Sequence, residues 1–185
     1  MDKKILLIGD SIRMSYQELV QKKLDHKAII SGPSENCRFS AYTLFNLPNW
    51  VNEEHYDIIQ WNNGQWDTCY MEDNKIHTSL NIYLEYQQRI CEFLKKKTDR
   101  LIFATTTPVW NEMMTEERKH YRNNEDIVQY NNAVVEMLNS NGVEINDIHS
   151  VVSKDIKHVI CDDMVHLNDT GKEIISDLIV SKFSL

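Results

Sequence analysis

The stretch Ile5-Leu6-Leu7-Ile8-Gly9-Asp10-Ser11 decides how the fold of this chain is interpreted. Its four successive apolar residues predict a strand that is buried on both faces, and helical spacing follows over residues 12–23. A serine between such a strand and helix lies on a sharp turn at the carboxyl edge of a sheet, where open α/β folds bind their ligands. Ser11 is therefore the first candidate for a reactive side chain.

Strands and helices alternate along the rest of the chain. Further strands are expected at 27–31, 56–61, 100–105 and 143–147, and further helices at 40–47, 80–97, 126–140 and 170–183. The helix at 40–47 is expected to end before Pro48. This alternation predicts an α/β protein, a three-layer α/β/α sandwich with a central parallel sheet and right-handed crossovers. Because the chain has 185 residues and no internal repeats or low-complexity linkers, residues 1–185 are expected to form one domain.

The charge balance limits the kinds of partner. Lysine and arginine number 20 against 28 acidic residues, which gives a net charge of −8 and argues against binding to nucleic acid or an anionic membrane. No apolar run approaches the roughly 18 to 20 residues that span a bilayer. The first residues, 1–4, lead directly into the first strand without the regions of a secretory signal. A cytoplasmic protein is the simplest expectation.

Cysteine and histidine spacing gives no indication of a metal or a cofactor. The four cysteines form no C-x-x-C pair, so they are expected to be reduced thiols; they are Cys37, Cys69, Cys91 and Cys161. No H-E-x-x-H or comparable ligand cluster occurs. The single glycine of the Gly9-Asp10-Ser11 turn is too little for a phosphate cradle.

A second polar motif precedes the last expected helix. In the segment 162–168, Asp163 and His166 are three residues apart. A serine nucleophile needs a base to take its proton, and an imidazole needs a carboxylate to fix its tautomer, so these two residues complement Ser11. Alone, D-x-x-H arises often by chance, and its histidine is commonly a helix-capping or surface residue. Its occurrence together with an early Gly-Asp-Ser favours a catalytic interpretation.

The two motifs in this order resemble the SGNH, or GDSL-like, hydrolase superfamily of esterases and acetylesterases, over nearly the whole chain. Intermediate segments agree in order, namely 105–108, 130–131, 143–147 and 166–171. The resemblance implies the flavodoxin-like fold of these hydrolases without a cofactor. It also implies a catalytic triad in which Ser11 is the nucleophile, His166 the base and Asp163 its carboxylate partner.

The block that usually supplies an oxyanion asparagine departs from the family pattern. Its usual form is Gly-x-Asn-Asp, and alignment on Gly64 and Asp67 puts Trp66 where the asparagine belongs. Asn62 and Asn63 precede the same glycine, and Asn-x-Gly-x-x-Asp resembles a subgroup of the superfamily. We therefore expect the donor to be displaced rather than lost, with only one of the two asparagines facing the site because strand side chains alternate.

A second departure concerns the block in which the family usually presents a glycine N–H to the oxyanion. Here Arg38 is near the equivalent position, and a backbone donor does not depend on the side chain. Arg38 is a candidate in two ways: through its amide for the oxyanion, or through its guanidinium for a substrate carboxylate or sugar hydroxyl. An exposed loop arginine is the alternative. Asn36 is expected to cap or brace this loop.

Other residues near the strand ends have open interpretations. Asp10 is expected to brace the turn by hydrogen bonds, and with Trp66 it is a candidate for contact with substrate. Trp61 and Trp66 are either an aromatic platform for a sugar ring or ordinary packing residues. The charged segment 111–124 has weak periodicity and is a candidate lid over the strand ends.

The resemblance implies a serine esterase that acts on small acyl esters through an acyl-enzyme. The favoured partner is a small-molecule ester or acetylated saccharide, with an O-acetylated carbohydrate as the specific expectation. Two alternatives stay open. One is a non-catalytic carbohydrate-binding or structural protein on the same fold, and the other is an O-acyltransferase that uses the same residues.

Overall fold

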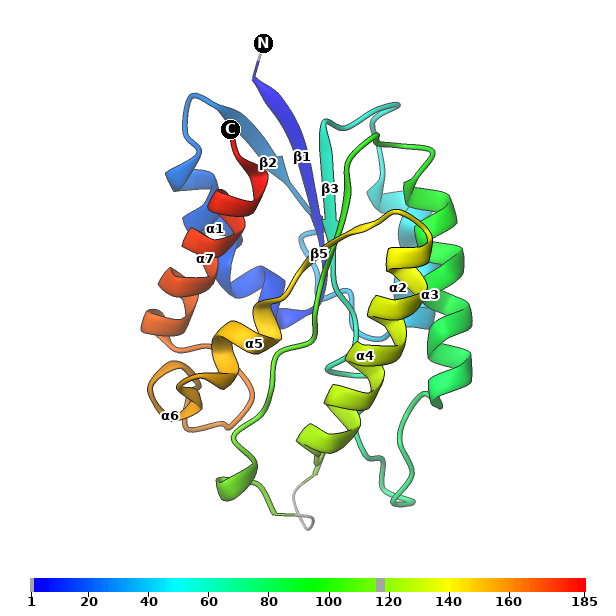
Figure 1. Ribbon diagram of the computed structural model, residues 1–185, viewed down its shortest axis with the longest axis vertical. Helices are drawn as coiled ribbons and strands as arrows, with labels where there is room; N and C mark the ends of the chain where they lie inside the picture. The colour runs from blue at the N-terminus through cyan, green and yellow to red at the C-terminus, as the bar shows by residue number, and fades with distance from the viewer. Residues whose placement is uncertain (1, 116–118) are drawn as a thin grey trace.

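The computed structural model describes residues 2–115 and 119–185. Five strands form one parallel sheet in the order β2-β1-β3-β4-β5 (Figure 1). They are β1 (Lys3–Ile8), β2 (Ala28–Ser31), β3 (Ile58–Trp61), β4 (Leu101–Ala104) and β5 (Glu144–Asn146). The predicted parallel sheet is confirmed.

Helices cover both faces of this sheet (Figure 1). One face carries α1 (Ser11–Lys23), α5 (Ile148–Ser153), α6 (Ile156–Val159) and α7 (Asp169–Phe183). The other carries α2 (Ser40–Trp50), α3 (Leu80–Leu94) and α4 (Asn124–Ser140). Side chains of β1 alternate between the two cores, with Ile5 and Leu7 in the first and Leu6 and Ile8 in the second. The three-layer α/β/α sandwich expected from the sequence is therefore the observed architecture.

The strand register places four segment ends side by side. Ile8 lies opposite Trp61, Trp61 opposite Phe103, and Ala104 opposite Asn146. The residues that follow these strands therefore gather at one edge of the sheet, the carboxyl edge at the bottom of Figure 1. They include the Gly9-Asp10-Ser11 turn and the polar segment 62–67.

Several helix boundaries differ from the sequence expectation. The helix predicted to end before Pro48 continues to Trp50, so that boundary was wrong. Pro48 is in the last turn, where the ring removes one backbone donor, and the Val51 N–H still bonds to the Leu47 carbonyl at 2.9 Å. The short helices α5 and α6 were not expected, because six and four residues are too few to show a helical period.

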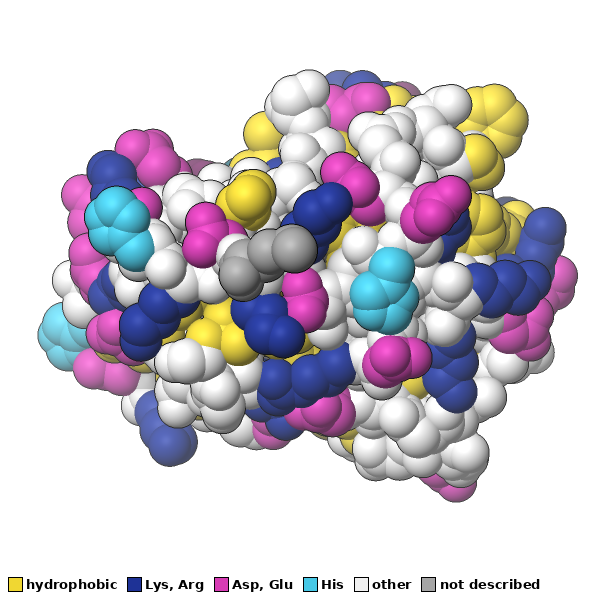
Figure 2. All heavy atoms as spheres, turned by 90° about the horizontal axis from the view of Figure 1, so that it is seen from above, with side chains coloured by type: hydrophobic (Ala, Val, Ile, Leu, Met, Phe, Trp, Pro, Cys, Tyr) yellow, Lys and Arg dark blue, Asp and Glu magenta, His cyan; other side chains and the backbone are white. Residues whose placement is uncertain are grey.

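The face at the amino ends of the strands carries charges of both signs, as Figure 2 shows. Basic and acidic side chains lie within pairing distance there, including Lys3 with Asp57 at 2.8 Å and Lys4 with Glu53 at 3.0 Å. All four cysteines are free, and three of them are buried. Among the described helices, none has the length and apolar character that crossing a bilayer requires.

Gly64 is a position that no other residue fits. Its φ of +148° is in the region that favours glycine, and an added Cβ would lie 1.9 Å from Thr106 Oγ1. We expect Gly64→Ala to lower the free energy of unfolding by about 1–3 kcal/mol from backbone strain, with the steric contact adding to this. Denaturant unfolding of both proteins measures the difference, and an unchanged midpoint would contradict it. Gly142→Ala is the matched control, because its φ is +70° but its added Cβ meets no atom within 4 Å.

Candidate active site

Ser11 is the first residue of α1, directly after the turn that ends β1. Asp10 is the N-cap of this helix, and its Oδ1 accepts a hydrogen bond from the Ile12 N–H at 3.0 Å. The Gly9 carbonyl accepts the Cys37 N–H at 3.2 Å. A Cβ on Gly9 would lie 2.0 Å from Asn62 Oδ1, so glycine permits the close approach of the Asn62 side chain. The turn that presents Ser11 is thus fixed on both sides.

The loop between α6 and α7 brings His166 and Asp163 to this turn. Ser11 Oγ lies 2.8 Å from His166 Nε2, and His166 Nδ1 lies 2.5 Å from Asp163 Oδ2. Asp163 Oδ1 also accepts the backbone N–H groups of Val165 at 3.0 Å and His166 at 2.9 Å. All three residues named from the sequence motifs are therefore brought together, although serine and histidine are 155 positions apart.

The electrostatics of this cluster favour an ionised carboxylate next to the imidazole. Partial burial of Asp163 opposes ionisation, but the N–H groups of His166 and Val165 and the imidazole outweigh it and lower the pKa of the carboxyl group. The side chains of His166 and Asp163 are 43% and 44% exposed. A small molecule can therefore reach the serine, and the imidazole can take its proton.

The structure separates the roles of the two candidate oxyanion asparagines. The side-chain amide of Asn63 donates to the Arg38 carbonyl at 3.2 Å and to Thr43 Oγ1 at 2.9 Å, which engages both of its N–H groups. The Asn62 side chain instead lies against Gly9. Burial raises the pKa of the Asp10 carboxyl group, and a hydrogen bond from Asn62 opposes this rise. Of the two, Asn62 is thus the one beside the serine turn.

Arg38 adopts a left-handed conformation, with φ of +53°. Its N–H donates to Asn36 Oδ1 at 2.8 Å, so Asn36 braces this loop. Its guanidinium lies 4.8 Å from the centre of the Tyr42 ring. The backbone donor named from the sequence is therefore engaged within the loop, and the side chain rests on α2.

The two tryptophans near the end of β3 have different surroundings. Trp61 is fully buried and donates from Nε1 to Gln87 Oε1 at 2.9 Å, so it packs in the core and does not form a sugar platform. Trp66 is partly exposed, and its ring centre lies 5.5 Å from that of His120. The Arg122 guanidinium lies 5.7 Å from the Trp66 ring centre. Trp66 thus belongs to the rim formed with the 120–122 segment.

Asp67 is a buried carboxylate that holds the start of α2. It accepts the Ser40 N–H at 3.1 Å and the Ser40 hydroxyl at 2.5 Å. Burial raises its pKa to about 6, and nearby Asp10 adds to the shift, while the Ser40 and Thr78 hydrogen bonds oppose it. This contact ties the segment after β3 to the loop that carries Arg38.

The raised pKa of Asp67 predicts a pH-dependent contribution to stability. At pH values between the unfolded-state pKa of 3.8 and the folded-state pKa of about 6, the Asp67 carboxyl group holds a proton in the folded state and releases it in the unfolded state. This contribution therefore grows as pH falls through 6 towards 4, by about 3 kcal/mol in all. We expect the stability of the wild type relative to Asp67→Asn to rise over that window in urea titrations at pH 7, 6, 5 and 4. A difference that stays constant would contradict the assignment.

Arg13 is a structural residue of the site that the sequence did not indicate. It is 2% exposed, and its guanidinium donates to the carbonyls of Gly9 at 3.2 Å, Pro33 at 2.9 Å and Glu35 at 2.9 Å. It therefore fastens the turn before Ser11 to the loop before Arg38. Two of these carbonyls, those of Pro33 and Glu35, belong to a loop that is distant in the sequence, and no side-chain motif reveals such contacts.

The candidate lid 111–124 lies partly outside the described residues, which lack 116–118. Its first part is a short 3-10 helix, η1 (Asn111–Met113), and Asn124 already opens α4. Trp110 N–H bonds to the Met164 carbonyl at 2.9 Å, so this segment begins beside the loop of Asp163 and His166. No group of three metal-binding side chains occurs among the described residues.

Comparison with known proteins supports the fold. No family model and no curated protein matches the sequence. Among solved structures, the acetyl xylan esterase AlAXEase superposes with a TM-score of 0.80 at 18% identity, covering 97% of this chain and 98% of that one. The lipase/acylhydrolase from Enterococcus faecalis gives 0.79 at 17% identity, covering 97% and 94%. A GDSL-like lipase from Bacteroides thetaiotaomicron gives 0.74 at 15% identity, covering 98% and 88%.

These superpositions cover 97–98% of this chain. The resemblance drawn from the Gly-Asp-Ser and D-x-x-H motifs is confirmed for the fold. The chain has the α/β fold of SGNH, or GDSL-like, hydrolases.

Proposed function

We propose that this chain is a serine esterase in which Ser11, His166 and Asp163 form the catalytic triad. The observation that carries the proposal is the continuous pair of contacts from Ser11 Oγ to His166 Nε2, at 2.8 Å, and from His166 Nδ1 to Asp163 Oδ2, at 2.5 Å. The structural neighbours named above as esterases and acylhydrolases support the same reaction class.

In the proposed reaction, Ser11 Oγ attacks the ester carbonyl carbon while His166 Nε2 takes the serine proton. The carbonyl oxygen becomes an oxyanion, which the Ser11 N–H and the Asn62 amide stabilise. The bond to the alcohol oxygen then breaks, and His166 protonates the departing alcohol. Water then attacks the acyl-enzyme while His166 takes a proton from it. His166 returns this proton to the Ser11 oxygen as the bond to the acyl group breaks, which releases the acid and restores Ser11.

The substrate we propose is a small acyl ester, with an O-acetylated carbohydrate as the specific candidate. Two of the structural neighbours are named as acetyl xylan esterases, and they cover 97% and 99% of this chain. The half-exposed His166 and Asp163 side chains favour a substrate whose alcohol part extends outward from an open site. A substrate with a long acyl chain needs an enclosed tunnel, which fits these exposed side chains less well.

Acyl-enzyme formation tests this proposal directly. The protein is mixed with p-nitrophenyl acetate, p-nitrophenolate release is followed, and the quenched protein is digested and analysed by mass spectrometry. We expect turnover above the buffer rate and an acetyl group on the peptide that contains Ser11. A fluorophosphonate probe, which reacts with activated serines whatever their acyl preference, is expected to label the same residue. Absence of labelling at Ser11 by both reagents would overturn the proposal.

A further inference from the structure

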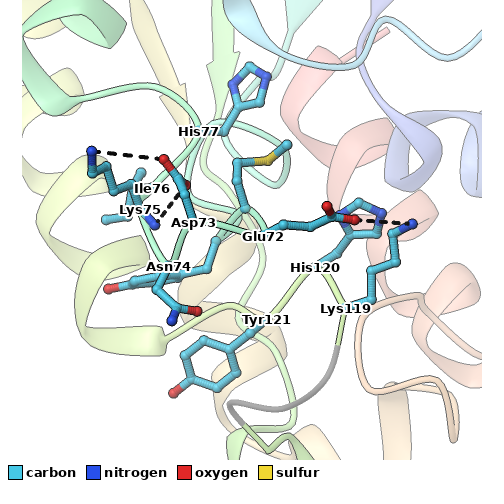
Figure 3. Close-up of a pocket in the computed structure, with 11 residues that line it drawn as sticks. Glu72, Asp73, Asn74, Lys75, Ile76, His77, Lys119, His120 and Tyr121 are labelled. Carbon is cyan, nitrogen blue, oxygen red and sulfur yellow. Dashed lines mark hydrogen bonds and ion pairs between the residues drawn. The ribbon is translucent and has the colours of Figure 1, made fainter.

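A groove of about 1030 Å³ is lined by residues 70–77 and 119–121 (Figure 3). One wall is the turn 70–77, in which Tyr70 pairs with Ile76, and the other wall is the segment 119–121. The Tyr70 N–H bonds to the Tyr121 carbonyl at 2.8 Å, so the two walls are joined at the base. The volume is near the upper end of the range of about 300–1,000 Å³ for ligand sites.

Both walls contact residues of the candidate active site. The His77 ring lies 4.4 Å, centre to centre, from the ring of Phe39, the residue after Arg38. On the other wall, the His120 ring meets Trp66 at 5.5 Å. The groove therefore borders two of the blocks that were singled out around the oxyanion.

The groove has no excess of either charge. Its two acidic and two basic side chains form two pairs, Asp73 with Lys75 within the turn 70–77 at 3.9 Å and Glu72 with Lys119 across the rim at 4.0 Å (Figure 3). Each lysine has a carboxylate beside it, so the lining carries no net positive charge that would select a phosphate or carboxylate ligand. A ligand without net charge fits this lining better than an anion does.

The remaining lining combines aromatic rings with neutral hydrogen-bonding groups. Tyr70 and Tyr121 stand with ring centres 5.4 Å apart, and His77 and Asn74 add an imidazole and an amide. Aromatic faces pack against C–H surfaces, while phenol, imidazole and amide groups bond to hydroxyls. The Tyr70 hydroxyl donates to Asp126 at 2.9 Å, so its oxygen acts towards a ligand as an acceptor. His77 Nδ1 contacts the Thr78 hydroxyl at 2.8 Å, which leaves His77 Nε2 for a ligand. A sugar chain presents both kinds of surface in one molecule, whereas an acyl chain presents only the first.

We propose that this groove binds the sugar chain of a neutral O-acylated oligosaccharide whose ester group reaches Ser11. Its volume of about 1030 Å³ is several times that of one sugar ring, so we expect it to select oligosaccharides over single sugars. Reaction at the ester rests on the proposed function, whereas binding in the groove does not depend on it.

Binding is measured by calorimetry on the non-hydrolysing Ser11→Ala protein, with partially O-acetylated tetrasaccharides of glucose, xylose and mannose and their monosaccharide counterparts. We expect at least one tetrasaccharide to bind at least tenfold more tightly than its monosaccharide. Adding His77→Ala or Asn74→Gly is expected to weaken that binding at least tenfold. Glycine suits position 74 because Asn74 has φ of +57°, so only the amide is lost.

The matched controls are His158→Ala and Tyr86→Phe, which lie outside the groove lining. They are expected to leave tetrasaccharide binding unchanged, and circular dichroism confirms that each variant is folded. The proposal is overturned if no tetrasaccharide binds, or if the groove variants bind as tightly as Ser11→Ala alone. If tetrasaccharides bind through the groove but Ser11 reacts with neither acyl reagent, the esterase proposal fails while the groove assignment stands.

Discussion

Alanine in place of Ser11 or of His166 is expected to lower kcat for p-nitrophenyl acetate by about 10⁴- to 10⁶-fold. Ser11→Ala removes the atom that forms the acyl-enzyme, and His166→Ala removes the group 2.8 Å away that takes its proton. Because the two side chains act in one step, the double variant is expected to lose little more than either single variant. Stopped-flow and steady-state assays at equal protein concentration measure these losses.

The same assay includes His158→Ala as the control. His158 pairs with Asp155 at 2.6 Å, so it reproduces the exposed His–Asp pair without a serine in contact with it in the described structure. We expect wild-type kcat in this control. Full activity in Ser11→Ala, with the variant shown to be pure by mass spectrometry, would remove the triad from the mechanism.

The fold was predictable because its signals are local. A buried β1 gives a continuous apolar run, and α3 and α4 give long apolar stripes, so alternation alone indicates a parallel sheet. The helices α5 and α6 were missed because they are too short to show a helical repeat of apolar residues. Pro48 was read as a stop, but a proline in the last helical turn costs only one backbone hydrogen bond.

The candidate triad was predictable for a different reason. Gly-Asp-Ser and D-x-x-H are short motifs, each at an end of a regular element, and a parallel sheet gathers such ends at one edge. Asp163 also fixes its own loop through two backbone N–H groups, so its sequence distance from His166 determines the geometry. The two motifs and the expectation of a parallel sheet were therefore enough to predict that these residues meet.

The contacts around the oxyanion were not predictable from the sequence. Whether Asn62 or Asn63 faces the serine turn depends on how β3 ends and on the positive φ of Gly64. Because the two residues are adjacent and identical, the sequence does not distinguish their orientations. Arg13 reaches the backbone carbonyls of Pro33 and Glu35, which are 20 and 22 residues away in the sequence. Trp61 was an open alternative between platform and core, and only packing against Phe103 decides for the core.

Asn62→Ala is expected to lower kcat by about 10²- to 10³-fold with little change in KM, because an oxyanion donor acts mainly in the transition state. Asn63→Ala is the matched comparison, since both variants delete the same amide one residue apart. It is expected to lower the free energy of unfolding by about 1–3 kcal/mol, because the Arg38 carbonyl and Thr43 hydroxyl lose a buried donor.

The two variants are separated by measuring kcat, KM and urea unfolding on the same preparations. The assignment requires the larger loss of kcat in Asn62→Ala and the larger loss of stability in Asn63→Ala. Burial raises the pKa of Asp10, and the hydrogen bond from Asn62 opposes this rise, so some loss of stability is expected in Asn62→Ala too. If Asn63→Ala instead loses more kcat while it remains folded, Asn63 is the donor, and its amide must leave Thr43 when an oxyanion forms.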